Sequence, residues 1–276
     1  MYAMNVKKLR LGLIGKDVSQ SKSKQIHTFI LNRWGVECEY VFFSVRKEEF
    51  DNTMRCLLGD FDGFNVTIPY KRDVMEYLDG VEGDAMAFGA VNTVLTSTRT
   101  GYNTDGVGFM QMLRAANICP QGKKVLVLGA GGAGRSTAVA LKLAGAEVFL
   151  YQRNREKLLE TCQELGIQPA ESGEQGGFDI LVNCTGVGMH DTQGRSPVGT
   201  AAFEGAVAAI DLIYLPQETE FLRLAKACGS QTLNGESMLF YQAYYADCLY
   251  LGKMPDDAEA EELYTQYRIW KEKAGV

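Results

Sequence analysis

Short apolar runs alternate with amphipathic stretches along the first part of the chain. Three mainly apolar runs predict strands over Leu9–Ile14, Glu39–Val45 and Phe61–Val66. Apolar residues at helical spacing predict helices over Lys24–Trp34 and Lys47–Leu58. Because strand and helix alternate, the pattern indicates βαβ units and a largely parallel sheet.

The same alternation begins again at Lys124 and predicts a second α/β unit. Its predicted strands are Val125–Leu128, Glu147–Tyr151, Ile180–Asn183 and Val207–Asp211, and its predicted helices are Gly132–Ala144 and Arg155–Leu165. Pro120 and Gly122 separate the two series, and the helical pattern over Gly106–Ala116 belongs to the junction. The chain therefore divides into two α/β regions.

The end of the chain is helical only. After Gly235 the pattern predicts helices over Ser237–Leu251 and Asp256–Lys271, with no strand between or after them. Helices without a following strand can fold back over the first domain. We therefore expect a discontinuous first domain that these helices complete.

Length and charge exclude several classes of function. The 276 residues exceed the usual size of one hydrophobic core, so two domains or one large α/β unit are expected. A net charge of −6 with no run of Lys or Arg gives little attraction to a phosphate backbone, so we expect no nucleic-acid partner. No apolar stretch approaches the roughly 20 residues of a bilayer span. Because Met1–Arg10 also lacks an apolar signal core, we expect no membrane association and a cytoplasmic location.

Cysteine and histidine usage gives no sign of a metal site. Seven cysteines are scattered singly with no Cys-x-x-Cys pair, which is typical of free thiols in a reducing compartment. The two histidines, His27 and His190, have no second soft ligand at metal-site spacing. We interpret His27, one turn into its helix, as a capped or half-buried residue without a catalytic role.

A glycine-rich loop joins the strand that ends at Leu128 to the helix that follows. The loop reads Gly129, Ala130, Gly131, Gly132, Ala133, Gly134, a G-x-G-x-x-G. The first glycine permits a tight turn, the second lets backbone N–H groups approach a pyrophosphate, and the third lets helix and strand pack closely. The helix N-terminus adds partial positive charge. The loop predicts a dinucleotide site on a Rossmann-type fold; the alternative is a glycine-rich turn without a ligand.

The end of the next strand decides which dinucleotide is favoured. NAD sites usually have Asp or Glu there to bind the ribose 2′-hydroxyl, whereas this chain has Gln152, Arg153, Asn154 and Arg155. Guanidinium groups suit the bidentate recognition of a 2′-phosphate. The sequence therefore favours NADP(H) over NAD(H), and the alternative is that both arginines are solvated cations at the start of a helix.

Three regions of the first domain carry polar side chains on loops. Gly15–Ser23 follows the first strand, where hydroxyls and N–H groups before a helix can receive a carboxylate or, alternatively, only cap the helix. Gly63–Lys71 runs off a strand end, where α/β enzymes often place functional groups, and the alternative is a surface lysine after a turn. Gly89–Thr93 and Gly101–Gly106 form the third region. Together the three predict a site for a small polar substrate.

With the dinucleotide loop, these regions resemble the shikimate dehydrogenase family over nearly the whole chain. The matching segments are the N-V-T-x-P-x-K motif at Asn65–Lys71, then Gly89–Thr93, Asn103–Gly106, Gly129–Gly134, Asn183–Met189, Asp211–Thr219 and Gly235–Gln242. The resemblance implies the NADPH-dependent reduction of 3-dehydroshikimate, a hydroaromatic carboxylate, in aromatic amino acid biosynthesis. We expect a monomer or homodimer.

The resemblance implies roles for single residues. Lys71 and Asp105 form the catalytic pair, in which Lys71 would protonate an alkoxide while Asp105 holds the ammonium group. Substrate contacts are implied for Ser21 and Ser23, which would bind the carboxylate, and for Asn65, Thr67, Asn92 and Gln242, which would contact the ring hydroxyls. Tyr214 is a further candidate for a substrate contact, and the alternative is that it packs in the core. Cofactor contacts are implied for the six residues of the glycine-rich loop, for Gln152, Arg153, Asn154 and Arg155, and for Thr185, Gly188, Met189, Gly235 and Met238. The alternative for the two methionines is packing without a cofactor contact.

These assignments predict an α/β fold in two domains. Residues 1–104, completed by residues 237–276, form an α/β substrate-binding catalytic domain, and residues 105–236 form a Rossmann-type NADP-binding domain. The segment that carries Ser21 and Ser23, here called the serine loop (residues 15–24), departs from the family pattern. Asp17, Gln20 and Lys24 stand where the family usually has Pro, His and Pro. A quinate or aminoshikimate dehydrogenase of the same family is therefore the alternative enzyme. A dinucleotide-binding sensor without catalysis is the non-enzyme alternative.

Overall fold

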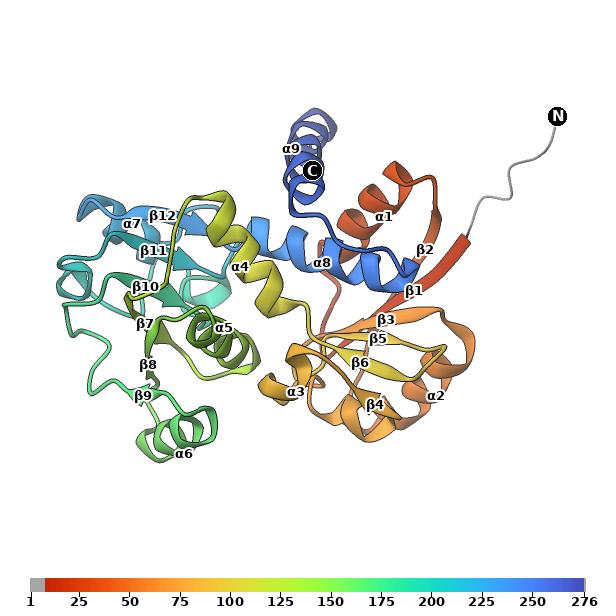
Figure 1. Cartoon of the computed structure of the whole chain (residues 1–276), viewed down its shortest axis with the longest axis horizontal. Helices are drawn as coiled ribbons and strands as arrows, with labels where there is room; N and C mark the ends of the chain where they lie inside the picture. The colour runs from red at the N-terminus through yellow and green to blue at the C-terminus, as the bar shows by residue number, and fades with distance from the viewer. Residues whose placement is uncertain (1–7, 276) are drawn as a thin grey trace. The chain divides into compact units, whose positions relative to one another are not determined.

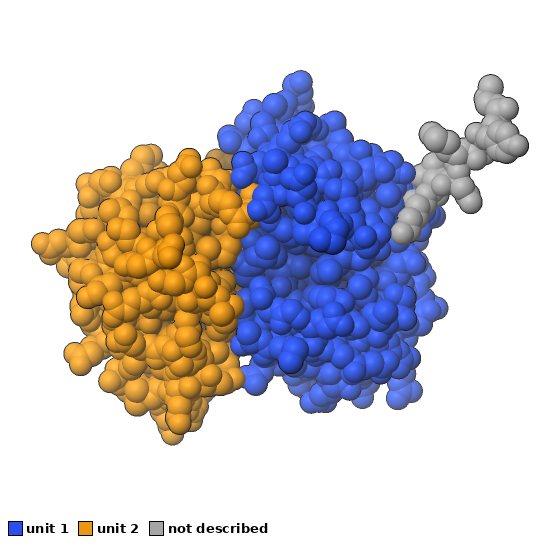
Figure 2. All heavy atoms as spheres, viewed as in Figure 1, with its two compact units in different colours: residues 1–108, 239–276 blue, residues 109–238 orange. Residues whose placement is uncertain are grey.

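The computed structural model describes residues 8–275 of the chain (Figure 1). Two compact units are present (Figure 2): unit 1 consists of Met1–Gly108 with Leu239–Val276, and unit 2 of Phe109–Met238. The N-terminal segment, interpreted above as lacking a signal core, lies mostly outside the described residues.

Unit 1 contains a six-stranded sheet in the order β2-β1-β3-β5-β6-β4. The strands are β1 (Lys8–Gly15), β2 (Glu37–Ser44), β3 (Gly63–Val66), β4 (Gly80–Val81), β5 (Thr93–Leu95) and β6 (Thr100–Tyr102). β1 pairs in parallel with both β2 and β3, as expected of βαβ units. β5 is antiparallel to β3 and to β6. β5 and β6 form a hairpin, because the short connection between them can join only antiparallel strands. The alternation of helix and strand did not predict this hairpin.

Helices cover both faces of the unit 1 sheet (Figure 1). α2 (Phe50–Asp60) packs on one face in a buried cluster that includes Ile14 of β1. α1 (Ser23–Arg33) and α8 (Glu236–Leu251) pack on the opposite face in a second cluster that includes Leu13. Neighbouring residues of β1 thus serve opposite faces, as strand geometry requires.

The C-terminal helices belong to the first half of the fold. α9 (Asp257–Ala274) follows α8 and packs on α1, where the rings of Phe29 and Tyr267 meet edge to face at 5.3 Å. The predicted return of these helices to the first domain is confirmed. The shorter helical elements of unit 1 are η1 (Lys47–Glu49), η2 (Asp73–Tyr77) and α3 (Asp84–Phe88).

Unit 2 contains a parallel six-stranded sheet in the order β12-β11-β10-β7-β8-β9. Its strands are β7 (Lys124–Leu128), β8 (Glu147–Tyr151), β9 (Gln168–Pro169), β10 (Ile180–Asn183), β11 (Ala208–Asp211) and β12 (Gln231–Asn234). The chain crosses from β9 to β10 on the other side of β7, which is the strand order of a Rossmann fold. In such sheets ligands bind beyond the carboxyl ends of the strands where the order reverses.

The remaining helical elements belong to unit 2 or to its junction with unit 1: α4 (Asp105–Ala115), α5 (Gly132–Leu143), α6 (Arg155–Leu165), α7 (Glu220–Ala227), η3 (His190–Thr192) and η4 (Thr200–Phe203). α7 and β12 were not predicted from the sequence. β12 reads Gln-Thr-Leu-Asn and none of its residues is fully buried, so it has no apolar run by which to recognise it. By contrast, β7, β10 and β11 are almost wholly buried. Their sequences are therefore apolar runs, and all three strands were predicted.

His27 lies deeper than its sequence position indicates. Its side chain is fully buried, whereas a capped or half-buried residue was expected. The cause is α8, which packs over α1 and brings Asp247 to 2.6 Å from His27 Nδ1. A partner 220 residues away cannot be recognised from the helix that carries the histidine.

Residues 8–275 show neither a membrane span nor a metal-binding cluster. None of the helices there is long and apolar enough to cross a membrane. The same residues contain no group of three or more His, Cys, Asp or Glu side chains arranged to hold a metal ion. The seven cysteines, all within the described part of the chain, are free thiols.

Candidate active site

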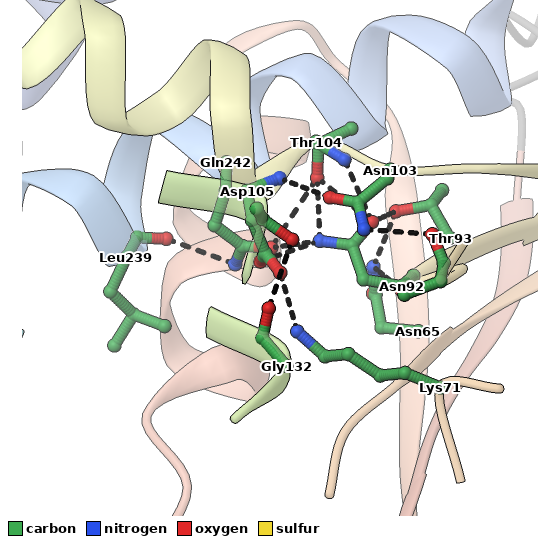
Figure 3. Close-up of polar contacts among 12 residues, drawn as sticks. Asn65, Lys71, Asn92, Thr93, Asn103, Thr104, Asp105, Gly132, Leu239 and Gln242 are labelled. Carbon is green, nitrogen blue, oxygen red and sulfur yellow. Dashed lines mark hydrogen bonds and ion pairs between the residues drawn. The ribbon is translucent and has the colours of Figure 1, made fainter. Parts of the chain in front are cut away.

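Lys71 and Asp105 form an ion pair in unit 1. Lys71 lies beyond the end of β3, where its carbonyl accepts a hydrogen bond of 2.8 Å from the backbone N–H of Val91. Asp105 is the first residue of α4. The Lys71 Nζ lies 2.5 Å from Asp105 Oδ2, and the two side chains are 14% and 9% exposed (Figure 3). Because water is largely excluded there, the attraction between the two charges is screened little.

The carboxylate of Asp105 is held on both sides. One oxygen faces Lys71, and the other accepts a hydrogen bond of 2.8 Å from Asn92 Nδ2. The Asp105 backbone N–H donates to Asn103 Oδ1 at 3.0 Å, which fixes the start of α4. A negative charge at this end of a helix is also favoured by the helix dipole. The carboxylate is thus oriented before any ligand binds.

Asn92 is the centre of a polar network (Figure 3). Its Nδ2 also lies 3.1 Å from Thr104 Oγ1 and 3.3 Å from Gln242 Oε1, so it connects the loop before α4 to α8. Its Oδ1 accepts from Thr93 Oγ1 at 2.9 Å and from the Thr104 backbone N–H at 2.8 Å. Buried polar groups with this many partners hold a single arrangement.

Asn65 joins the same network from β3. Its Nδ2 donates to Thr93 Oγ1 at 3.2 Å and to the Asn92 carbonyl at 3.3 Å, while its Oδ1 accepts from the Tyr40 hydroxyl at 2.8 Å. The predicted site residues that the structure brings together in unit 1 are therefore Asn65, Lys71, Asn92, Asp105 and Gln242. Sequence reasoning missed Tyr40, because nothing in the pattern of β2 marks it as a partner of Asn65.

The two serines lie at the start of α1. Ser21 Oγ lies 3.0 Å from Ser23 Oγ and accepts from the Ser23 backbone N–H at 3.2 Å. Lys22 occupies the N-cap position and no side chain caps the helix, so neither serine serves as its N-cap. The serine loop also meets the loop after β3, because a Cβ atom on Gly15 would lie 2.5 Å from Thr67 Cγ2.

The glycine-rich loop of unit 2 has the geometry of a dinucleotide loop. Gly129 has a φ of +98°, which favours glycine, and a Cβ atom on Gly134 would lie 1.9 Å from the Gly129 carbonyl oxygen. Gly131 is the N-cap of α5, no side chain caps the helix, and the space where a Cβ atom would stand is open for 4 Å. Uncapped N–H groups beside open space are suited to a phosphate. The loop therefore fits a dinucleotide.

Gln152, Arg153, Asn154 and Arg155 follow β8 beside this loop. The Gly129 backbone N–H donates to the Tyr151 carbonyl at 2.8 Å, so the loops after β7 and β8 are neighbours. Gln152 is half-buried and the two arginines are exposed. Asn154 is the N-cap of α6, where its Oδ1 accepts from the Lys157 N–H at 3.0 Å. The Asn154 oxygen therefore caps α6.

A buried network that the sequence analysis did not predict shapes the loops after β10 and β11. Asp211 Oδ1 accepts from Asn183 Nδ2 at 3.1 Å, and its Oδ2 accepts from Thr219 Oγ1 at 2.6 Å. Burial raises the pKa of Asp211 to about 6, although these hydrogen bonds and one from the Ile213 N–H act to lower it. Asn183 Oδ1 accepts from the Thr185 hydroxyl at 2.7 Å. One sequence feature could have revealed this network. The buried strands β10 and β11 each end in a polar residue, Asn183 and Asp211.

The other predicted cofactor residues also lie in unit 2. Gly188 has a φ of +120°, and a Cβ atom on Gly235 would lie 2.1 Å from the Leu212 carbonyl oxygen, so both positions require glycine. Met189 is half-buried and Met238 is buried. Tyr214, predicted to contact the substrate, is half-buried in unit 2, and burial raises the pKa of its phenol.

One family model and several curated proteins match this chain. The family model of the shikimate dehydrogenase substrate binding domain matches residues 13–94. A curated relative from Thermus thermophilus, a shikimate dehydrogenase (NADP(+)), is 38% identical over 92% of this chain and 97% of its own length. Another of the same name from Caldanaerobacter subterraneus is 39% identical over 89% of this chain and 92% of its own length.

The fold agrees with that of a solved relative. The crystal structure of the Thermus thermophilus shikimate 5-dehydrogenase in complex with NADP(H) and shikimate has a TM-score of 0.86 and 36% sequence identity. The match covers 94% of this chain and 99% of that one. The predicted resemblance and fold class are therefore confirmed.

Proposed function

We propose, because this chain belongs to the shikimate dehydrogenase family, that it catalyses the NADPH-dependent reduction of 3-dehydroshikimate to shikimate and the reverse oxidation. The observation that carries the proposal is the contact of 2.5 Å between Lys71 and Asp105 inside a polar network of unit 1. A pair of this kind supplies what carbonyl reduction needs from the protein, a proton and a positive charge beside the oxygen.

We assign the proton transfer to Lys71. NADPH held by unit 2 supplies the hydride when bound. In reduction the Lys71 ammonium stabilises the negative charge on the substrate oxygen and then gives it a proton, which leaves a neutral amine. In oxidation the neutral amine removes the hydroxyl proton. Asp105 acts as the orienting group, because its 2.5 Å contact holds Nζ in one place.

Substrate orientation is the task that we assign to the remaining polar residues of unit 1. The hydroxyls of Ser21 and Ser23, at the uncapped start of α1, are suited to the substrate carboxylate. The ring hydroxyls are assigned to Asn65, Thr67, Asn92 and Gln242, and Tyr214 of unit 2 is assigned to the substrate as well. Binding the carboxylate at a distance from the reacting carbon orients the ring for reaction.

Cofactor binding is assigned to unit 2. The pyrophosphate is assigned to the glycine-rich loop from Gly129 to Gly134, and the 2′-phosphate to Arg153 and Arg155 with Gln152 and Asn154 beside them. Thr185, Gly188, Met189, Gly235 and Met238 are assigned to the nicotinamide half of the cofactor. The open space at Gly131 supports the first of these assignments.

A quinate or aminoshikimate dehydrogenase is the second candidate. It is favoured by the serine loop, where Asp17, Gln20 and Lys24 are exposed and replace the usual residues of the family. The sensor without catalysis is disfavoured, because Lys71 and Asp105 are both present and in contact.

Turnover of shikimate, quinate and aminoshikimate should be measured in parallel, each with NADP+ and with NAD+, by the absorbance of the reduced nicotinamide. We expect shikimate with NADP+ to give the highest kcat/KM. Preferential turnover of quinate or aminoshikimate would assign the changed specificity to the serine loop. No turnover of any of the three, with NADP+ still bound, would favour the sensor.

We also propose a cytoplasmic location and a monomeric or homodimeric state. The location is supported by the seven free thiols, which suit a reducing compartment. Sedimentation of the purified protein distinguishes a monomer from a homodimer, and a larger assembly would contradict the proposal.

A further inference from the structure

Tyr40 of β2 contacts the proposed substrate site through Asn65. Its phenol is 2% exposed, and its hydroxyl donates to Asn65 Oδ1 at 2.8 Å. Burial raises the pKa of Tyr40 well above its ordinary value. The phenol therefore stays protonated and donates to Asn65 of β3.

The hydroxyl of Tyr40 also fixes which way the Asn65 amide points. An amide has one oxygen that only accepts and one nitrogen that only donates. Because Tyr40 donates to Oδ1, Nδ2 is turned toward Thr93 Oγ1 and the Asn92 carbonyl, to which it donates. One lone pair of Oδ1 then remains for a hydroxyl of the ligand.

His27 holds the ring of Tyr40 from one face. The two rings are stacked, with centroids 4.8 Å apart and an angle of 19° between their planes. His27 Nδ1 lies 2.6 Å from Asp247 Oδ1, and both side chains are fully buried. Since His27 belongs to α1 and Asp247 to α8, this pair joins the helix that begins with Ser23 to the helix that carries Gln242.

Stability alone is a poor explanation for this pair. Among the residues that the structure describes, no group hydrogen-bonds His27 Nε2 or Asp247 Oδ2. Buried polar atoms without partners destabilise a fold, and buried ion pairs can often be replaced by apolar residues without loss of stability. A role in positioning the neighbouring site accounts for the arrangement better.

We propose that Tyr40 is a positioning residue that sets the orientation of the Asn65 amide, and that the His27–Asp247 pair holds Tyr40 in place. The proposal rests on the proposed function, in which Asn65 binds a ring hydroxyl of the substrate. Tyr40, His27 and Asp247 contact neither Lys71 nor the reacting atoms in this assignment. Their effect is therefore expected in substrate binding.

The first test compares Tyr40→Phe with Tyr244→Phe in the full-length protein. Both variants lose a buried phenol hydroxyl, and that of Tyr244 contacts Asp256 and Glu259 at the start of α9. We expect Tyr40→Phe to raise the KM for shikimate about three- to tenfold, as for one lost hydrogen bond, with kcat and the KM for NADP+ nearly unchanged. Tyr244→Phe should change none of these. An equal KM for shikimate in both variants would overturn the proposal.

The second test asks whether Tyr40 acts through Asn65. Asn65→Ala and the double variant of Asn65→Ala with Tyr40→Phe should have nearly the same KM for shikimate, because the hydroxyl has lost its partner in both. Losses that multiply in the double variant would show that Tyr40 does not act through Asn65.

The third test concerns Asp247. Asp247→Asn keeps an oxygen that can accept from His27 Nδ1, whereas Asp247→Leu removes it. We expect Asp247→Leu to raise the KM for shikimate and Asp247→Asn to restore most of the binding. If the two variants differ in Tm but share the wild-type KM, the pair is only structural and the proposal is wrong.

Failure of the proposed function looks different from failure of this inference. If the wild-type protein does not turn over shikimate, the function is wrong. If the wild type turns over shikimate and Tyr40→Phe has the same kinetics as Tyr244→Phe, only the positioning role is wrong.

Discussion

A Cβ atom on Gly134 would lie 1.9 Å from the carbonyl oxygen of Gly129, whereas a Cβ atom on Gly131 would meet nothing within 4 Å. The two glycines of one loop therefore serve different purposes. Gly134 lets α5 pack against the turn after β7, and Gly131 keeps open the space in which we place the pyrophosphate.

The first prediction compares alanine at these two positions. Gly134→Ala should lower the free energy of unfolding by roughly 1–3 kcal/mol, because helix and turn must move apart. Gly131→Ala should keep the wild-type Tm and weaken NADP+ binding about tenfold or more, because the methyl group enters the phosphate space. Thermal unfolding and NADP+ titration of both variants check this. Unchanged NADP+ affinity in Gly131→Ala would mean that the pyrophosphate binds elsewhere.

The second prediction concerns the choice of cofactor. Arg153→Ala should raise the KM for NADP+ by about 10- to 100-fold, the usual loss for a hydrogen bond to a charged group, and leave the KM for NAD+ nearly unchanged. Arg223→Ala, which removes an exposed arginine paired with Glu220 on α7, is the control and should change neither constant. Equal losses with both cofactors in Arg153→Ala would contradict a role for Arg153 in binding the 2′-phosphate.

The third prediction is a pH dependence of stability that originates in Asp211. Burial raises the pKa of this carboxyl from 3.8 to about 6, so between these values the folded protein binds more protons than the unfolded chain. The group therefore stabilises the fold at low pH, and this contribution is lost as pH rises through about 6. The difference corresponds to about 3 kcal/mol.

Urea unfolding of the wild type and of Asp211→Asn at pH values between about 4 and 7 measures this contribution. An amide does not titrate in this range, so the stability of Asp211→Asn relative to the wild type should increase as pH rises. A difference that stays constant with pH would show that Asp211 titrates as an ordinary carboxyl.

Much of the fold could be predicted from local pattern. Strands such as β7 and β10 are short apolar runs because both faces of a parallel sheet are buried, and the glycine-rich loop lies between a buried strand and a helix. β12 was missed because its residues are only partly buried, and the β5–β6 hairpin was missed because its strands are three residues each.

Part of the candidate site could be predicted from the sequence. The predicted residues lie in local motifs, and the missed ones depend on contacts between distant elements. Lys71, Asp105 and Asn92 lie in short motifs at strand and helix ends, so the chain itself marks them. His27 and Asp247 meet only because α8 packs over α1, across 220 residues of sequence, and Tyr40 of β2 meets His27 of α1 only by packing of that helix on the sheet. The spacing of residues within one helix or strand does not predict such contacts.

The central claim is that Lys71 transfers the proton in NADP(H)-dependent shikimate chemistry, and kcat of Lys71→Ala with shikimate and NADP+ tests it most directly. NADP+ affinity is measured on the same sample, and Lys47→Ala, which breaks an exposed ion pair of 2.7 Å with Asp73, is the control. We predict that Lys71→Ala loses about 10²- to 10⁴-fold in kcat with NADP+ affinity retained, and that Lys47→Ala keeps wild-type turnover. Near-normal kcat in Lys71→Ala would contradict the assignment of the proton transfer to this lysine.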